Sequence, residues 1–151
     1  MNPAPPGWPR ISAALYYQDA AKAIDWLCKA FDFQVRLKVE ADDGSVLHSE
    51  VTYGEGLIMV SDSKRSAEKP AWGYRKSPGE AGGANTQSLM VYVDDVEAHC
   101  RRAREAGAKI VTEPETHDYG EEYWTDRGYE AEDAGGHHWW FFQRLRTPVV
   151  K

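Results

Sequence analysis

The feature that most constrains the fold of this chain is an internal repeat. The segment "ALYYQDAAKAIDWLCKAF" aligns without a gap with "MVYVDDVEAHCRRAREAG" at an offset of 76 residues. Further along, "TYGEGLIMV" aligns with "DAGGHHWWF" at an offset of 81 residues. A repeat of this length indicates that one supersecondary unit is present twice. About five extra residues, around "ETHDYG", are then accommodated in the second copy.

Each copy is predicted to form a strand, a helix and three more strands. In the first copy, "ISAALYY" is strand-like, and "DAAKAIDWLCKAF" has apolar residues at helical spacing behind the N-cap Asp19. The strands "FQVRLKVE", "SVLHSEVTYG" and "GLIMVSD" follow, separated by "DDG" and "GEG" turns. The second copy repeats this order, with a helix between Asp94 or Asp95 and Gly107 and strands in "SLMVYVDD", "KIVTEPE", "EYWTDRGYEAED" and "HHWWFFQRL". The pattern predicts an α+β fold made of two β-α-β-β-β modules.

The boundaries of these modules follow from composition. Residues 1–10 contain four prolines and are expected to be extended and partly loose. The first module spans residues 11–63 and the second spans residues 87–146. Residues 64–86 are rich in Ser, Lys, Gly, Pro and Ala, so we expect a long connecting loop there.

Composition also limits the class of protein. With 42% hydrophobic residues in 151, the chain can bury a substantial core without disulfides, and its two cysteines lie in helical patterns where they act as small hydrophobes. The net charge of -6 and the scattered basic residues argue against nucleic acid as a partner. No signal peptide or membrane span is recognisable, which predicts a cytoplasmic protein with no membrane partner.

The adjacent histidines His137 and His138 raise the question of a metal site. Successive side chains of a strand point to opposite faces, so at most one of the two can enter any one site. His138 should share a face with Trp140 and Phe142, whereas His137 is expected to be a polar residue of the turn or the opposite face.

A second candidate is the pair His48 and Glu50 in "SVLHSEV". Residues two apart on a strand face the same side, which suits a proton-transferring or metal-ligating pair. The alternative is an exposed strand face with ordinary polar residues. If that face lines a cavity, His48, Glu50 and His138 could together form an unusual metal site.

Two other histidines, His99 and His117, are weaker candidates for a functional site. His99 lies in a helix among charged neighbours and is expected at the solvated surface. His117 lies in the inserted segment "ETHDYGEEYW" with Tyr119 and Trp124. This segment could border a ligand site, because loops on a rigid scaffold often carry specificity, or it could be an edge turn with aromatic packing.

Aromatic residues are frequent at positions expected on one face of the strands. They could form a stacking wall for a planar or apolar ligand, or they could fill the interior of a small barrel. These residues are Tyr16, Tyr92, Trp124, Trp140 and Phe142.

Two such modules in one chain resemble the vicinal oxygen chelate superfamily, which includes glyoxalase I, bleomycin resistance proteins and extradiol dioxygenases. The resemblance rests on "YYQDAAKAIDWLCKAFDF", "VYVDDVEAHCRRAREAGAKIVTEP" and "DAGGHHWWFF", and it covers the chain from Ile11 to about Arg146. It implies one glyoxalase-like domain in which two curved mixed sheets surround a cavity.

The resemblance also implies where a metal would be held. Metal-binding members place a His or carboxylate on the first and last strand of each module, and these positions fall on Ser12, Met59, Ser88 and Trp140. Ser, Met and Trp do not form the ligand set of a divalent ion. A divalent metal is therefore disfavoured, and no cofactor is expected.

The resemblance implies a small-molecule binding protein of the glyoxalase and bleomycin-resistance type, metal-free and homodimeric, with an aromatic or apolar ligand. The expected ligand-binding residues are Tyr16, Met59, Ser88, Tyr92, Tyr119, Trp124, His138 and Trp140. The alternative is a lyase, isomerase or dioxygenase of the same fold that uses His48 and Glu50 as catalytic residues, with or without a divalent metal. A third alternative is a structural module whose interior is filled by its aromatic residues.

Overall fold

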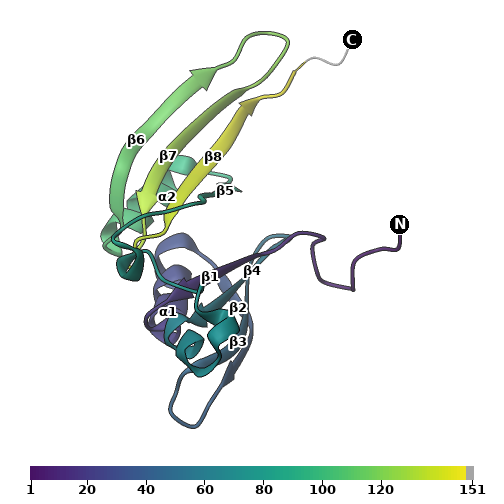
Figure 1. Ribbon diagram of the computed structural model, residues 1–151. Helices are drawn as coiled ribbons and strands as arrows, with labels where there is room; N and C mark the ends of the chain where they lie inside the picture. Colours follow the sequence, from purple (N-terminus) through teal and green to yellow (C-terminus); the bar gives the residue numbers. More distant parts are fainter. Residues whose placement is uncertain (149–151) are drawn as a thin grey trace. The chain divides into compact units, whose positions relative to one another are not determined.

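The chain forms two compact units, each with one long helix and one four-stranded sheet (Figure 1). The computed structural model describes residues 1–148, and the boundary between the units lies between Ala84 and Asn85. Each unit is described below by itself.

The first unit contains β1 (Ala13–Tyr17), α1 (Ala20–Phe31), β2 (Gln34–Glu40), β3 (Val46–Tyr53) and β4 (Gly56–Asp62). Its strand order is β1-β4-β3-β2. β1 is parallel to β4, whereas the β3–β4 and β2–β3 pairs are antiparallel.

The second unit contains β5 (Leu89–Tyr92), α2 (Val96–Glu105), β6 (Lys109–Asp118), β7 (Thr125–Glu132) and β8 (His138–Arg146). Its strand order, β5-β8-β7-β6, and its one parallel pair, β5 with β8, reproduce the first unit. The predicted α+β fold of two β-α-β-β-β modules is confirmed.

Both helices begin in the same way. The side chains of Asp19 and Asp95 accept hydrogen bonds from the backbone N–H three residues along the helix, at 3.1 and 2.9 Å. Each aspartate is extended while the next residue is helical, the usual arrangement of an N-cap.

The last strand of each unit also holds the start of the helix. The first helical N–H of α1 donates to Asp62 Oδ1 at 3.0 Å, and that of α2 donates to Gln143 Oε1 at 3.1 Å. Asp62 and Gln143 are related by the 81-residue offset found in the sequence. The repeat therefore extends to an interaction that fixes each helix to its own sheet.

His99 corrects one expectation from the sequence. It is buried, with 7% of its surface exposed, and its Nδ1 lies 2.7 Å from the hydroxyl of Tyr129. Its ring also lies 4.3 Å from the ring of Phe141. His99 is a core residue of the second unit because Tyr129 gives it a hydrogen-bonding partner.

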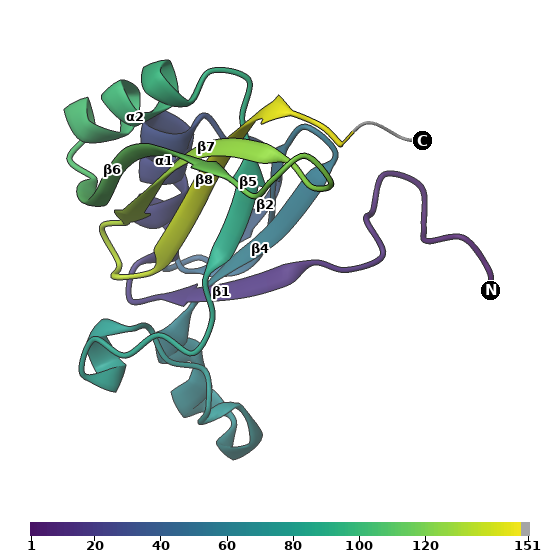
Figure 2. The same ribbon diagram turned by 90° about the horizontal axis from the view of Figure 1, so that it is seen from above.

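The connection between the modules is more ordered than a plain loop. It forms three short 3₁₀ helices, Ser63–Glu68, Pro70–Trp72 and Gly79–Ala81, which make a separate lobe in Figure 2. The Arg75 guanidinium lies over the Trp72 ring at 4.2 Å and over the Tyr16 ring of β1 at 5.6 Å. Cation–π contacts thus attach the connection to the first sheet.

Two other segments differ from expectation. β6 runs to Asp118, so His117 lies on a strand and the β6–β7 loop is shorter than the insertion suggested. In the N-terminal extension, the Trp8 ring packs against the Arg36 guanidinium at 5.3 Å, which holds this part of the extension near β2.

Among residues 1–148 no helix is long and apolar enough to cross a membrane.

Candidate functional site

The second sheet has two chemically different faces. Trp139 and Phe141 of β8 are completely buried on the face that carries α2. The alternate residues His138, Trp140 and Phe142 are only partly buried and lie on the opposite face, which we call the open face. Strand alternation thus places His138 and Trp140 on the same side.

A stacked aromatic pair forms the centre of this open face. The rings of Trp140 and Phe142 are nearly parallel, at 10°, with centroids 5.6 Å apart. Across the sheet, Phe142 is paired with Gly128 of β7 and with Tyr92 of β5. A Cβ atom on Gly128 would lie 2.3 Å from Cδ1 of Phe142, so the ring occupies the space that glycine leaves.

Next to the aromatic pair, Arg144 joins a polar cluster. Its Nε donates to Asp126 Oδ1 at 2.5 Å, and its Nη2 donates to Asp126 Oδ2 at 3.3 Å and to the Tyr92 hydroxyl. The guanidinium carbon lies 5.1 Å from the ring centroids of both Tyr92 and Trp124. Hydrogen bonds and two aromatic rings therefore hold the arginine in one orientation.

The protonation states of this cluster follow from its contacts. Hydrogen bonding to Asp126 raises the pKa of Arg144 above its ordinary value. Burial, and then the negative charge of Asp126, raise the pKa of the Tyr92 phenol. The raised pKa values keep Arg144 charged and the Tyr92 phenol neutral at neutral pH, and the Tyr92 hydroxyl donates to Asp126 Oδ2 at 3.2 Å.

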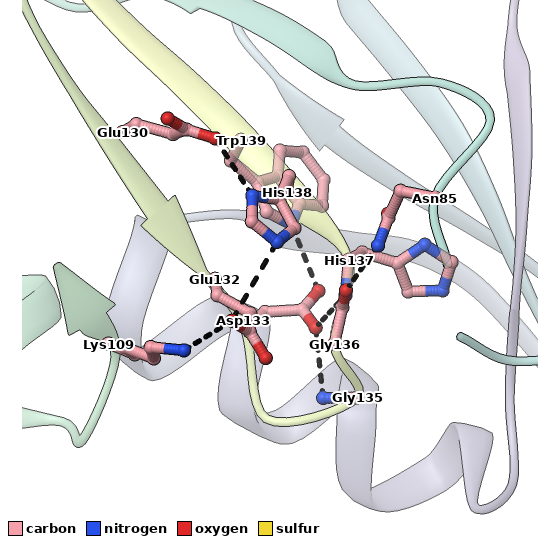
Figure 3. Close-up of polar contacts among 10 residues, drawn as sticks. All are labelled: Asn85, Lys109, Glu130, Glu132, Asp133, Gly135, Gly136, His137, His138 and Trp139. Carbon is pink, nitrogen blue, oxygen red and sulfur yellow. Dashed lines mark hydrogen bonds and ion pairs between the residues drawn. The ribbon is translucent and has the colours of Figure 1, made fainter. Parts of the chain in front are cut away.

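At the other end of the open face, His138 lies between two carboxylates (Figure 3). Its Nδ1 is 2.8 Å from Glu130 Oε1, and its Nε2 is 3.7 Å from Glu132 Oε2. Lys109 Nζ in turn donates a hydrogen bond to Glu132 Oε2 at 3.0 Å. His138 is therefore held in a network of charged side chains.

His137 belongs to the turn before β8, and its ring points away from that of His138 in Figure 3. Asp133 holds this turn: its Oδ1 accepts from the N–H groups of Gly135 and His137, and its Oδ2 accepts from Trp139 Nε1 at 2.9 Å. The aspartate thus fixes where β8 begins and which of its residues reach the open face.

The β6–β7 loop supplies further aromatic residues. The Tyr119 ring lies 5.8 Å from that of Trp124, and the Tyr123 ring meets Trp124 edge-on at 6.1 Å. Tyr119 is 52% exposed and Trp124 is 38% exposed. Trp124 also contacts Arg144, so it links the loop to the polar cluster.

In the first unit, the structure brings His48 and Glu50 together. His48 Nε2 is 3.1 Å from Glu50 Oε1, and Arg36 Nε donates to Glu50 Oε2 at 2.7 Å. Arg36 also donates to the carbonyl of Gly7 in the N-terminal extension. The hydrogen bond from His48, and then that from Arg36, lower the pKa of Glu50.

The other expected ligand residues are distributed over both units. Tyr16 and Met59 lie on the paired strands β1 and β4, and both are partly buried. Burial raises the pKa of Tyr16, while the Arg75 charge lowers it by a smaller amount. Ser88 is exposed and directly precedes β5.

Comparison with known proteins identifies the family. Residues 11–141 match the model of the Glyoxalase/Bleomycin resistance protein/Dioxygenase superfamily. The chain belongs to this superfamily. This membership accounts for the duplicated module.

Individual relatives share most of their length with this superfamily member. An uncharacterized protein of Mycobacterium bovis is 33% identical over 138 residues, which cover 91% of this chain and 85% of that protein. The crystal structure of TioX from Micromonospora sp. ML1 has 30% identity and a TM-score of 0.66, over 91% of this chain and 99% of that one. TnmS3, an antibiotic binding protein from Streptomyces sp. CB03234, has 19% identity and a TM-score of 0.62, over 88% of this chain and 93% of that one.

The donor atoms at the superfamily's metal positions do not suit a divalent ion. Those positions hold Ser12 and Met59 in the first unit and Ser88 and Trp140 in the second. Trp140 is stacked on Phe142 and has no lone pair to offer a metal. In the described part of the chain, no group of three or more His, Cys, Asp or Glu side chains is placed to hold a metal ion.

Sequence reasoning missed the polar part of this site. It did not select Asp126, Gly128 or Arg144, because each is unremarkable when the strand pairing is unknown. One signal was available: Asp126, Gly128, Glu130 and Glu132 alternate along β7, so four non-aromatic residues share the face opposite Tyr129.

Proposed function

We propose that this chain is a metal-free binding protein for a planar aromatic or apolar small molecule, which it takes up on the open face of its second unit. The observation that supports this most directly is the parallel Trp140–Phe142 pair, which lies partly exposed on a sheet face rather than in the core. This stacked pair lies next to Tyr92, which is paired with Phe142, and Trp124 lies against the nearby Arg144, so several aromatic rings are available to a planar ligand.

The position of the aromatic rings is set before any ligand binds. Phe142 is seated over Gly128, and Trp140 stacks on Phe142, so neither ring needs to be ordered by the ligand. A preformed surface avoids the entropic cost of fixing side chains on binding. The fold is also shared with TnmS3, which is an antibiotic binding protein.

The replacement Trp140→Leu tests this proposal. It keeps an apolar side chain but removes the flat surface, so we expect at least a tenfold loss of affinity for 2-isopropenylnaphthalene, measured by equilibrium dialysis. Trp26→Leu, on α1 of the first unit, is the matched control and should leave affinity unchanged. Equal affinity in the wild type and the Trp140 variant would contradict the proposal.

Metal content provides a separate test. The donor set at Ser12, Met59, Ser88 and Trp140 leads us to expect no stoichiometric divalent metal in the purified protein by elemental analysis. One tightly bound ion per chain would overturn the metal-free part of the proposal.

A second candidate function is catalysis by the His48–Glu50 pair. The 3.1 Å contact orients the imidazole, and the lowered pKa of Glu50 keeps its carboxylate charged beside His48. In such a pair His48 acts as the general base and Glu50 as the group that positions it. The reaction class would be lyase, isomerase or dioxygenase chemistry on a carbonyl or enediolate compound.

Substitution distinguishes this candidate from simple binding. If the pair is catalytic, activity on such compounds disappears in His48→Ala and Glu50→Ala, while His117→Ala, at a partly exposed strand position, retains it. Full activity in both variants of the pair would exclude these roles.

The remaining expectations concern the assembly and location of the protein. We propose a cytoplasmic homodimer, by analogy with the superfamily. Light scattering coupled to size-exclusion chromatography should give twice the chain mass of 17.0 kDa, and cell fractionation should recover the protein with cytoplasmic markers.

A further inference from the structure

We infer that the ligand carries a neutral carbonyl oxygen next to its aromatic group, and that Nη1 of Arg144 donates the hydrogen bond that recognises it. This inference rests on the function proposed above and assigns a chemical class to the ligand of that site. Three features of the open face support it: an unused donor, its charge balance and its distance from the aromatic pair.

The donor inventory of Arg144 leaves one nitrogen available. A guanidinium has five N–H groups. In the structure, Nε donates to Asp126, and Nη2 donates to Asp126 and to Tyr92. Within residues 1–148 both N–H groups of Nη1 lack a protein partner. The side chain is 31% exposed, so a ligand can reach it.

This donor is held in place before the ligand arrives. Asp126 occupies the Nε and Nη2 edge of the guanidinium, and its central carbon lies 5.1 Å from the ring centroid of Tyr92 and 5.1 Å from that of Trp124. Tyr92 lies on β5, Asp126 lies on β7, and Trp124 directly precedes β7. These residues therefore fix the orientation of Nη1. Preorganised donors of this kind give directional selectivity.

The charge balance favours a neutral acceptor over an anion. The buried carboxylate of Asp126, only 4% exposed, cancels the charge of Arg144. The same face carries Glu130 and Glu132, and the whole chain has a net charge of -6. A carboxylate ligand would lose its hydration without meeting a net positive charge, whereas a ketone or amide oxygen needs only the hydrogen bond.

The spacing matches one aromatic ligand with one substituent. Arg144 and Phe142 are two residues apart on β8 and lie on the same face, which corresponds to roughly 6–7 Å along the strand. A fused two-ring system lying against Phe142 and Trp140 can therefore present a carbonyl group to Arg144. The aromatic pair and the arginine then recognise different parts of the same molecule.

Three naphthalene probes of similar size test the inference on the full chain. They are 2-acetylnaphthalene, with a carbonyl oxygen, 2-isopropenylnaphthalene, with no acceptor, and naphthalene-2-carboxylate, with an anionic acceptor. Binding is measured by quenching of tryptophan fluorescence. We expect the ketone to bind about tenfold more tightly than the hydrocarbon, the effect of one hydrogen bond from a charged donor, and more tightly than the carboxylate.

Variants assign the preference to Arg144. Arg144→Lys retains the positive charge beside Asp126 but loses the guanidinium edge, so the ratio of ketone affinity to hydrocarbon affinity should fall to about one. The double variant Asp126→Asn with Arg144→Gln avoids a buried unpaired charge and should give the same result. Arg127→Lys is the matched control, because Arg127 lies on the opposite face and pairs with Glu97.

The outcomes separate this inference from the proposed function. If the ketone and hydrocarbon bind the wild type equally, or if Arg144→Lys keeps the preference, the inference is wrong although aromatic binding stands. Tighter binding of the carboxylate would show that the site selects anions instead. If none of the probes binds, the proposed function fails together with the inference.

Discussion

At the scale of single residues, Gly128 determines the shape of the candidate site. A side chain at this position would collide with Phe142, since an added Cβ lies 2.3 and 2.4 Å from two atoms of its ring. The backbone of Gly128 is not in the left-handed region, so glycine is required here by space rather than by conformation. The position of Phe142, and through it that of Trp140, depends on this absent side chain.

The variant Gly128→Ala should therefore change both the site and the stability. The added methyl group displaces the Phe142 ring. We expect this to lower the free energy of unfolding by about 1–3 kcal/mol and to weaken binding of 2-isopropenylnaphthalene at least tenfold. Urea unfolding and equilibrium dialysis measure the two effects. Gly79→Ala is the control, because its added Cβ meets nothing closer than 4.0 Å. If Gly128→Ala behaves like this control, Phe142 does not depend on the glycine.

At the scale of secondary-structure elements, the buried carboxylate of Asp62 joins three segments of the first unit. From the end of β4, its Oδ1 accepts from Ala20 N at the start of α1, and its Oδ2 accepts from Val46 N at the start of β3, at 2.6 Å. Asp62 is 4% exposed, so water cannot replace these bonds. By contrast, the side chain of the N-cap Asp19 accepts a hydrogen bond from Lys22 N at the exposed surface.

We therefore expect Asp62→Ala to destabilise the protein more than Asp19→Ala. The first variant leaves two buried N–H groups without acceptors, at a cost of about 2–4 kcal/mol, whereas loss of an N-cap costs about 1 kcal/mol. Chemical denaturation followed by circular dichroism compares the two free energies of unfolding. A smaller effect for Asp62→Ala than for Asp19→Ala would show that the junction tolerates water or rearranges.

The sequence predicted the elements well because their order depends on local patterns. Helical spacing and the N-caps Asp19 and Asp95 indicated both helices, and the repeat indicated the same order of elements along the chain in both copies. His99 was misjudged although it lies with Val96, Cys100 and Ala103 on the buried stripe of α2. Its burial depends on Tyr129, thirty residues away, and no local pattern reveals such a partner.

The candidate site was predictable only in part for the same reason. Strand alternation is local, so it correctly placed His138 with Trp140 on one face. The contact between Asp126 and Arg144 depends on the register of β7 against β8, in which these two residues are paired. That register is set by the length and geometry of the turn held by Asp133, which the sequence does not state directly.

At the scale of the whole molecule, carboxylates in both units couple stability to pH. The pKa of Asp43 is lowered by the Ser45 hydroxyl, that of Glu50 by His48 and then Arg36, and that of Asp118 by the Gly120 N–H and then Arg146. Each group is a stronger acid in the folded chain than in the unfolded chain. The unfolded chain therefore binds more protons in the acid range.

The sign of this linkage leads to the last prediction. A carboxylate with a lowered pKa stabilises the folded state fully above its unfolded value, about 4, and this stabilisation is lost as the pH falls through the folded value. We expect these carboxylates to make the free energy of unfolding fall steadily as the pH drops below about 4. Urea titrations at pH 7, 5, 4 and 3 measure this free energy.

Glu50→Gln should be less stable than the wild type at pH 7 and should lose less stability on acidification, because the variant lacks one of the linked protons. A free energy that stays level to pH 3, or an acid response unchanged by Glu50→Gln, would mean that these hydrogen bonds do not control the acid stability of the chain.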